Sequence, residues 1–157
     1  MSTDPDAESG IYARESVYLE RYVQVGVAGG RVLSVAFPTT PEAGAEETLP
    51  LLDRIDAYLE GQVDDFDDVA VAMTMPTNQG DVLEAVRSIP YGDDFSVEQV
   101  ARMTPGLDPE SEEDHQLIRT ALAENPAPLI VPDHRVRDGP SSAPPEVEQR
   151  LRSLESL

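Results

Sequence analysis

Asn125 to Val136 reads Asn-Pro-Ala-Pro-Leu-Ile-Val-Pro-Asp-His-Arg-Val, which is a turn, a short apolar run and a polar cluster in succession. The Asn-Pro pair ends whatever element precedes it, because proline disfavours helical geometry in the residue before it. The apolar run 129–131 is bounded by prolines and predicts a short buried strand. Asp133, His134 and Arg135 follow at the edge of that core. Three adjacent ionisable side chains at such a place form either a functional site or a salt-bridged corner.

The composition indicates a folded protein with a very acidic surface. The 157 residues include 31 aspartates and glutamates against 11 basic residues, so the formal net charge is −20. All the basic residues are arginines, and lysine is absent. A hydrophobic content of 39% is enough for a core, so the acidity does not signal a disordered chain. The acidity fits adaptation to very high salt, where repulsion is screened beyond about 3 Å, or mimicry of nucleic acid. The spread of acidic residues along the whole chain favours the first explanation.

The chain has no cysteine, which excludes disulfides, thiolate metal sites and a cysteine nucleophile. No segment is long and apolar enough to cross a membrane, and no charged-then-apolar leader opens the chain. We therefore expect a soluble cytoplasmic protein with no membrane partner and no cofactor. The acidic run 64–68 is interpreted as a solvated loop rather than a metal site.

The N-terminal half predicts strands and one helix, after a polar start at 1–10. Alternating valines predict a strand over 17–27, and Ala28-Gly29-Gly30 predicts a hairpin turn into a return strand over 31–37. The three- and four-residue spacing of Leu52, Ile55, Tyr58 and Leu59 predicts a helix over 47–60. A third strand is expected over 69–73.

The C-terminal half predicts helices. The first spans 78–89, and a capping box that begins at Ser96 opens a short second helix to about Met103. Asp108 and Pro109 provide an N-cap and a first-turn proline for a third helix over 109–124. A last amphipathic helix is expected over 146–157.

Three blocks of this sequence resemble the O6-alkylguanine-DNA alkyltransferases. That family's active site reads Asn-Pro, an apolar strand, then Pro-Cys-His-Arg-Val, and Asp133 stands here at the cysteine position. Upstream, Ile89-Pro90-Tyr91-Gly92 matches the family's Ile-Pro-Tyr-Gly, and 96–101 falls where its Ser-Tyr-Gly-x-Ile-Ala lies. The resemblance implies an α/β fold: a small N-terminal lobe, 1–75, with an antiparallel sheet and a helix, and a C-terminal winged helix-turn-helix lobe, 76–157, whose second helix enters the DNA groove.

The resemblance also implies a chemistry, which this chain lacks in part. In the family a thiolate takes the alkyl group from O6 of a flipped guanine, a histidine activates the thiol through water, and a glutamate orients the histidine. His134 retains the histidine, but a carboxylate at Asp133 is a far poorer nucleophile toward an alkyl carbon. We therefore expect that the protein transfers no methyl group and is not an enzyme. Glu155 is nearest to the orienting glutamate, although its offset along the sequence does not match.

The DNA contacts implied by the resemblance are mostly replaced. The family's intercalating arginine aligns with Gln116, and the tyrosine that turns the nucleotide out aligns with Val97. Residues 90–140 hold four arginines against eleven carboxylates, a local net charge of −7. The candidate DNA-binding residues are Gln116, Arg119, Asn125, Arg135 and Ser96. The alkyltransferase-like proteins, which also lack the cysteine, bind O6-alkylguanine and pass the lesion to excision repair.

Three hypotheses follow. The first is DNA-repair-related recognition of duplex DNA or alkylated guanine, with His134, Arg135, Asn125, Gln116 and Arg119 lining one groove. The second is a protein-interaction module that keeps the fold and uses the acidic third helix or the apolar face of the last helix. The third is a hydrolase-like site of Asp133 and His134, which requires both groups to meet at one open point.

Overall fold

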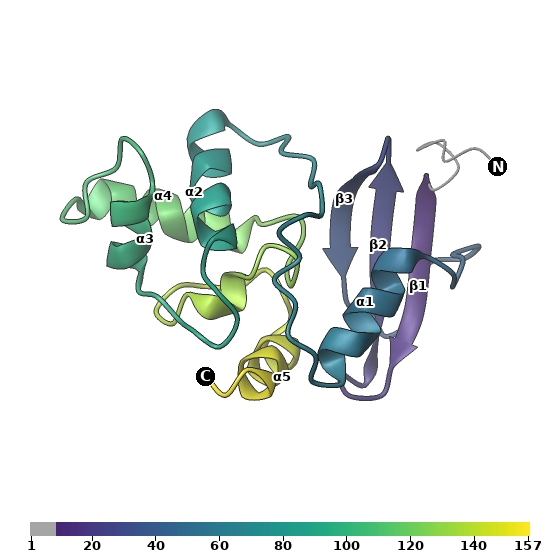
Figure 1. Cartoon of the computed structure of the whole chain (residues 1–157). Helices are drawn as coiled ribbons and strands as arrows, with labels where there is room; N and C mark the ends of the chain where they lie inside the picture. The colour runs from purple at the N-terminus through teal and green to yellow at the C-terminus, as the bar shows by residue number, and fades with distance from the viewer. Residues whose placement is uncertain (1–8) are drawn as a thin grey trace.

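The computed structural model describes residues 9–157, so most of the polar start lies outside the described residues. A three-stranded antiparallel sheet occupies one side of the molecule, in the order β1 (Gly10–Ser16), β2 (Arg21–Ala28) and β3 (Arg31–Ala36) (Figure 1). The predicted hairpin is confirmed. Gly29 and Gly30 connect β2 to β3 with φ of 60° and 76°, a left-handed geometry that glycine adopts without steric cost.

The first strand was not predicted, and the predicted strand over 17–27 begins too early. Residues 17–20 form a turn with Glu20 at φ 55°, and Leu19 N bonds Ser16 Oγ at 3.2 Å. This turn separates β1 from β2. The alternating valines used for the prediction began at Val17, inside the turn, so the predicted strand ran across a chain reversal. The expected third strand over 69–73 is reduced to one parallel bridge between Val71 and Val32 of β3.

Helix α1 (Pro50–Leu59) lies along the sheet, as Figure 1 shows, and confirms the predicted helix in a shorter form. Its buried residues are Leu52, Ile55, Tyr58 and Leu59, the four that the sequence spacing selected. They join the buried side chains of all three strands in one hydrophobic core. Arg54, on the same helix, binds Asp64 and Asp68 at 2.9 Å, so the acidic run is partly neutralised by an arginine.

Helices α2 (Thr77–Arg87), α3 (Val97–Met103) and α4 (Glu112–Ala123) pack together on the other side (Figure 1). The capping box is confirmed: Gln99 N donates to Ser96 Oγ at 3.1 Å and Ser96 N donates to Gln99 Oε1 at 2.8 Å. Helix α4 begins later than predicted, because Ser111 rather than Asp108 caps it. Among residues 9–157, no helix is long and apolar enough to span a membrane.

Helix α5 (Pro145–Leu154) connects the two sides of the molecule. It confirms the predicted last helix and buries Val147 and Leu151. Tyr18 Oη, from the turn after β1, donates to the carbonyl of Arg150 at 2.7 Å. Arg152 Nη1 donates to the carbonyl of His134 at 2.6 Å. The end of this helix therefore lies between the sheet and the polar cluster.

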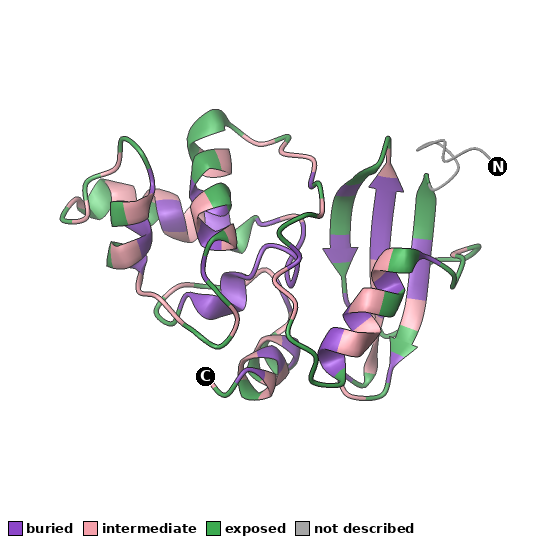
Figure 2. Ribbon diagram, in the orientation of Figure 1, coloured by how far each residue is buried: buried purple, intermediate pink, exposed green. Residues whose placement is uncertain are grey.

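The predicted strand over 129–131 is wrong, although all three residues are buried. The segment is a tight turn in which Leu129 has φ 81° and Pro128 bridges Val131. Prolines at 126, 128 and 132 remove three backbone donors, so a strand ladder has little to pair with. Asn125 supplies bonds instead, donating from Nδ2 to Val131 O at 3.0 Å and accepting from Ala127 N at 3.1 Å. This buried turn crosses the middle of the molecule (Figure 2).

Candidate functional site

The polar cluster predicted from the sequence forms a short 3-10 turn, η2 (Asp133–Arg135), in the centre of the protein. Asp133 and His134 are 0% exposed and Arg135 is 2% exposed. Burial of three ionisable side chains is unfavourable unless each finds a partner. The surroundings of each side chain therefore decide what the turn can do.

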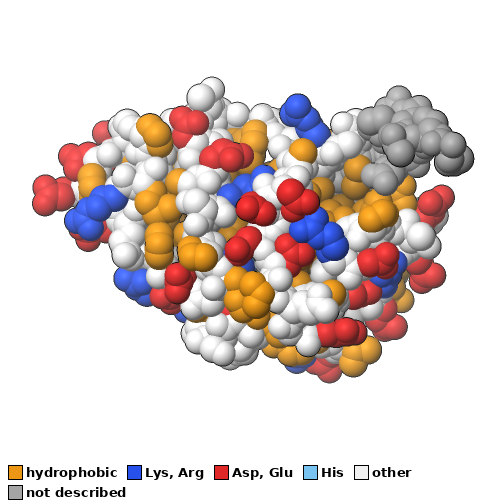
Figure 3. All heavy atoms as spheres, in the orientation of Figure 1, with side chains coloured by type: hydrophobic (Ala, Val, Ile, Leu, Met, Phe, Trp, Pro, Cys, Tyr) orange, Lys and Arg blue, Asp and Glu red, His pale blue; other side chains and the backbone are white. Residues whose placement is uncertain are grey.

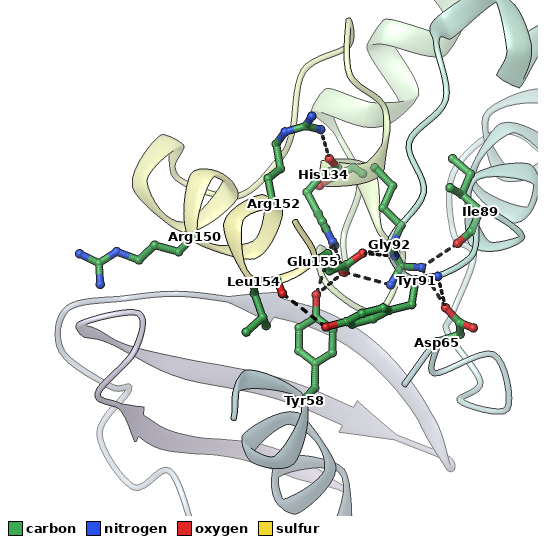
Figure 4. Close-up of polar contacts among 12 residues, drawn as sticks. Tyr58, Asp65, Ile89, Tyr91, Gly92, His134, Arg150, Arg152, Leu154 and Glu155 are labelled. Carbon is green, nitrogen blue, oxygen red and sulfur yellow. Dashed lines mark hydrogen bonds and ion pairs between the residues drawn. The ribbon is translucent and has the colours of Figure 1, made fainter. Parts of the chain in front are cut away.

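Glu155, one residue after α5, is the centre of a buried polar network (Figure 4). Its Oε2 accepts hydrogen bonds from His134 Nε2 at 2.8 Å and from the hydroxyl of Tyr58. Its Oε1 accepts from Arg135 Nε at 2.8 Å and from Gly92 N at 3.1 Å. In the sequence, the offset of Glu155 did not match that of the family's orienting glutamate. In the structure Glu155 contacts His134 directly, so the expectation of a mismatch is corrected.

Arg135 is the second centre of this network. Nη2 donates to Glu155 Oε2 at 3.0 Å, while Nη1 donates to Asp65 Oδ1 at 3.1 Å and to the carbonyl of Ile89 at 2.7 Å. The guanidinium also lies over the ring of Tyr91, 5.7 Å from its centroid. Every nitrogen of the guanidinium has a partner and the side chain is 2% exposed, so Arg135 braces the core.

The network determines the charge state of Glu155. Burial alone would raise its pKa, but hydrogen bonds from His134 and Arg135 outweigh burial and lower the pKa from 4.5 to about 2. Burial and the adjacent glutamate charge raise the pKa of Tyr58, which stays a neutral donor. Because Glu155 is an acceptor only, His134 carries a proton on Nε2.

Asp133 has separate partners. Its Oδ1 accepts from Ser141 Oγ at 2.6 Å, and its Oδ2 accepts from Asn125 Nδ2 at 3.0 Å. Ser142 donates to the same Oδ2 through its backbone N at 2.9 Å and through Oγ at 3.0 Å. Burial raises the pKa of Asp133, while Ser141 and Ser142 oppose that rise. The carboxylate is enclosed and satisfied, so it is not presented to a substrate.

His134 Nδ1 is buried and has no hydrogen-bond partner within residues 9–157. Because Nε2 donates to Glu155, Nδ1 is the ring nitrogen with a free lone pair. The hydrolase hypothesis needs Asp133 and His134 to meet at an open point, and neither side chain has any solvent exposure. The structure therefore gives this hypothesis no support.

The candidate DNA-binding residues do not line one groove. Asn125, His134 and Arg135 are buried, whereas Gln116 is exposed on α4 and Arg119, on the same helix, is half-buried. The groove expected from the sequence is corrected accordingly. Ser96 is committed to the cap of α3, and within residues 9–157 the Gln116 side chain donates only to Thr120 Oγ1, at 3.5 Å.

Several residues of the network were not identified as site residues from the sequence. These are Tyr58, Asp65, Tyr91 and Gly92. The inward face of α5 contained a signal for Glu155, because Val147, Leu151 and position 155 follow one another at four-residue spacing. Tyr58 was placed on a buried helix face, but nothing in the spacing indicated that its hydroxyl would meet a histidine far along the chain.

Comparison with known proteins identifies the family of this chain. A family model for the 6-O-methylguanine DNA methyltransferase DNA-binding domain matches residues 77–151. The methylated-DNA–protein-cysteine methyltransferase of Methanopyrus kandleri is 34% identical over 108 residues, which cover 67% of this chain and 77% of that protein. The chain belongs to the 6-O-methylguanine DNA methyltransferase family.

Solved methyltransferase structures share the fold. The O6-methylguanine-DNA methyltransferase of Pyrococcus kodakaraensis superposes with a TM-score of 0.70 at 19% identity, over 94% of this chain and 100% of that one. Mycobacterium tuberculosis OGT in complex with DNA gives a TM-score of 0.68 at 22% identity, over 94% and 91%. The α/β architecture predicted from the sequence, with an N-terminal sheet and a C-terminal helical DNA-binding domain, is thereby confirmed. Within this methyltransferase fold, the cysteine-free chain carries Asp133 directly before the buried histidine.

Proposed function

We propose that this chain is a non-catalytic member of the family, which recognises duplex DNA in a repair context and transfers no methyl group. The observation that carries the proposal is the enclosure of Asp133, which fills the position predicted for the nucleophile. Three neighbouring residues donate to this carboxylate, and none of its surface is exposed. A nucleophile has to reach the alkyl carbon with a free lone pair, and these bonds occupy the carboxylate.

The helix pair α3–α4 is the proposed DNA surface, within a winged helix-turn-helix lobe from about residue 76. The fold match to a methyltransferase in complex with DNA supports this placement. Gln116 is exposed on α4, and Arg119 makes no ion pair or hydrogen bond in the described part of the chain. Arg119 therefore has no internal ion pair to give up, and its charge is available to neutralise a DNA phosphate.

The acidity of the chain limits this interaction. Glu112, Glu113 and Asp114 occupy the first turn of α4, and Figure 3 shows carboxylates scattered over the visible face, with arginines between some of them. Such a surface repels DNA at low salt. If the protein works at molar salt, as its lack of lysine and charge of −20 suggest, screening suppresses this repulsion. Short-range contacts from Gln116 and Arg119 would then carry recognition.

A second candidate function rests on the same helix. An acidic first turn without compensating arginines fits a basic protein surface better than a phosphate backbone. In this alternative the chain keeps the family fold and binds a protein partner through α4.

A binding titration separates the two functions. Duplex DNA with and without one O6-methylguanine would be titrated from low to molar potassium chloride. The proposal predicts binding that is weakened by Gln116→Ala. Binding to neither duplex, at any salt where the chain remains folded, would overturn it in favour of the protein partner.

A further inference from the structure

The side chain of Asp133 holds down the segment of chain that follows η2. Ser141 and Ser142, which bond the carboxylate, lie between η2 and α5 in a segment without helix or strand. The two ends of this segment are seated in the core. A Cβ at Gly139 would come within 2.6 Å of Leu122 Cδ1, and Ala143 is 7% exposed. Its middle, at Ser141 and Ser142, is held chiefly by the carboxylate. We call residues 139–143 the cover.

The opposite side of the enclosure is formed by Asn125, which is part of the buried turn itself. Asn125 is 4% exposed, and its side chain bonds Val131 O and Ala127 N as well as Asp133. Removing Asn125 from Asp133 would break the buried turn, whereas lifting the half-buried serines breaks only bonds to one carboxylate and a local bond from Ala143 N to Ser141 Oγ at 3.1 Å. The cover is therefore the side that can open while the buried turn keeps its own hydrogen bonds to Asn125.

We propose that Asp133 is a latch: it holds residues 139–143 closed over the buried turn, so that an alkylated base can reach position 133 only after the bonds from Ser141 and Ser142 break. The ligand part of this inference rests on the proposed function, while the latch itself is a property of the fold. A site that is open in only a fraction of molecules binds its ligand more weakly by that fraction. Undamaged DNA, held on α4, has no need of position 133 and is unaffected by the latch.

Amide hydrogen exchange tests the latch without any DNA. Ser142 N bonds Asp133 and Ala143 N bonds Ser141 Oγ, so the amides at 142 and 143 report directly on the closed cover. In the double variant Ser141→Ala/Ser142→Ala, these amides should exchange at least about tenfold faster, since the two hydroxyl bonds that hold the cover to Asp133 are lost. Exchange at Val86, in the core of α2, separates local opening from global unfolding.

Ser88→Ala is the matched control, because Ser88 Oγ also bonds within the chain, to Ala85 O at 2.6 Å, but on an exposed helix end. Asp133→Asn is the second variant. It keeps one acceptor oxygen and the shape of the side chain, and it should also speed exchange at 142 and 143. Unchanged exchange at these amides in both variants, with Val86 as in the wild type, would overturn the latch.

The ligand part is tested with the duplexes used for the titration. The double variant should bind the O6-methylguanine duplex several-fold more tightly than the wild type does, with unchanged affinity for the undamaged duplex. Faster exchange with no gain in lesion affinity would overturn the claim that the cover guards position 133. Binding of neither duplex by any variant would instead overturn the proposed function, and amide exchange alone would then decide the latch.

Discussion

His134 Nε2 lies 2.8 Å from Glu155 Oε2, and both side chains are completely buried. The contact joins the 3-10 turn to the end of α5, twenty-one residues later in the chain. It places the Nε2 proton toward Glu155, and Nδ1 has no hydrogen-bond partner in the described part of the protein. The histidine and the glutamate that the resemblance implied are thus in direct contact in a chain that contains no cysteine.

Glu155→Gln should destabilise the protein strongly. Arg135 would lose its buried carboxylate, and breaking a buried ion pair from one side costs about 3–5 kcal/mol in the free energy of unfolding. Urea unfolding in molar potassium chloride at neutral pH measures this loss. Glu148→Gln, on α5, which ends just before Glu155, is the control. The pKa of Glu148 is raised by burial and by Asp133, so its charge does not stabilise the fold and the variant should be as stable as the wild type.

The same residue predicts an acid transition. The pKa of Glu155 falls from 4.5 to about 2 on folding, so its contribution is fully present above pH 4.5 and is lost as the pH drops toward 2. Unfolding measured across this range should show the wild type losing about 3 kcal/mol more than Glu155→Gln does. Parallel curves for the two proteins would contradict the assignment of Glu155 as the charged centre.

Tyr58→Phe tests the link between the sheet side and the polar cluster. The variant removes the hydroxyl that donates to Glu155 and keeps the ring, which packs edge-on against Phe66 at 5.6 Å between centroids. We expect a loss of about 1.5–3 kcal/mol in the free energy of unfolding, because the lost bond goes to a charged acceptor. A change below about 0.5 kcal/mol, the size typical of a surface substitution, would show that the hydroxyl is not part of the network.

Two glycines should respond to alanine in opposite directions. At Gly139 a Cβ would meet Leu122 Cδ1 at 2.6 Å and Val136 Cγ1 at 3.2 Å, so Gly139→Ala should cost about 1–3 kcal/mol. Gly80 lies inside α2, where the nearest atom to a Cβ is 3.7 Å away, so Gly80→Ala should stabilise by about 0.5–1 kcal/mol. Thermal unfolding of both variants beside the wild type checks the two signs.

The sequence predicted those elements whose signals are local. The capping box at Ser96 and the glycine hairpin at 28–30 depend on residues next to each other, and both are present as predicted. The buried face of α1 followed from helical spacing. The strand expected at 129–131 failed because apolar character reports burial rather than conformation, and the prolines around it favour a turn.

The site was predictable only in part, because its contacts join distant segments. Asp133, His134 and Arg135 were found together by sequence adjacency. The partners of His134 and Arg135 come from α1, from the acidic run, from Ile89 and from the end of α5, and no local pattern specifies such pairings. The network therefore became visible only with the fold.

Arg119→Ala should weaken binding to every duplex equally and reduce the slope of log affinity against log salt by about 1, since one phosphate contact is lost. Arg31→Ala is the matched control, because Arg31 is also an arginine without an ion pair or hydrogen bond within residues 9–157, but it lies on β3. A loss of affinity in Arg31→Ala equal to that in Arg119→Ala would move the DNA surface away from α4.

The fate of a radiolabelled methyl group tests the account most directly. The chain would be incubated with duplex DNA whose single O6-methylguanine carries the label, and the complex would be isolated in molar potassium chloride and then denatured. We predict that the label is retained with the native protein and leaves with the DNA on denaturation. Label that remains on the denatured protein would reveal methyl transfer and contradict the account, and so would the absence of label from the native protein.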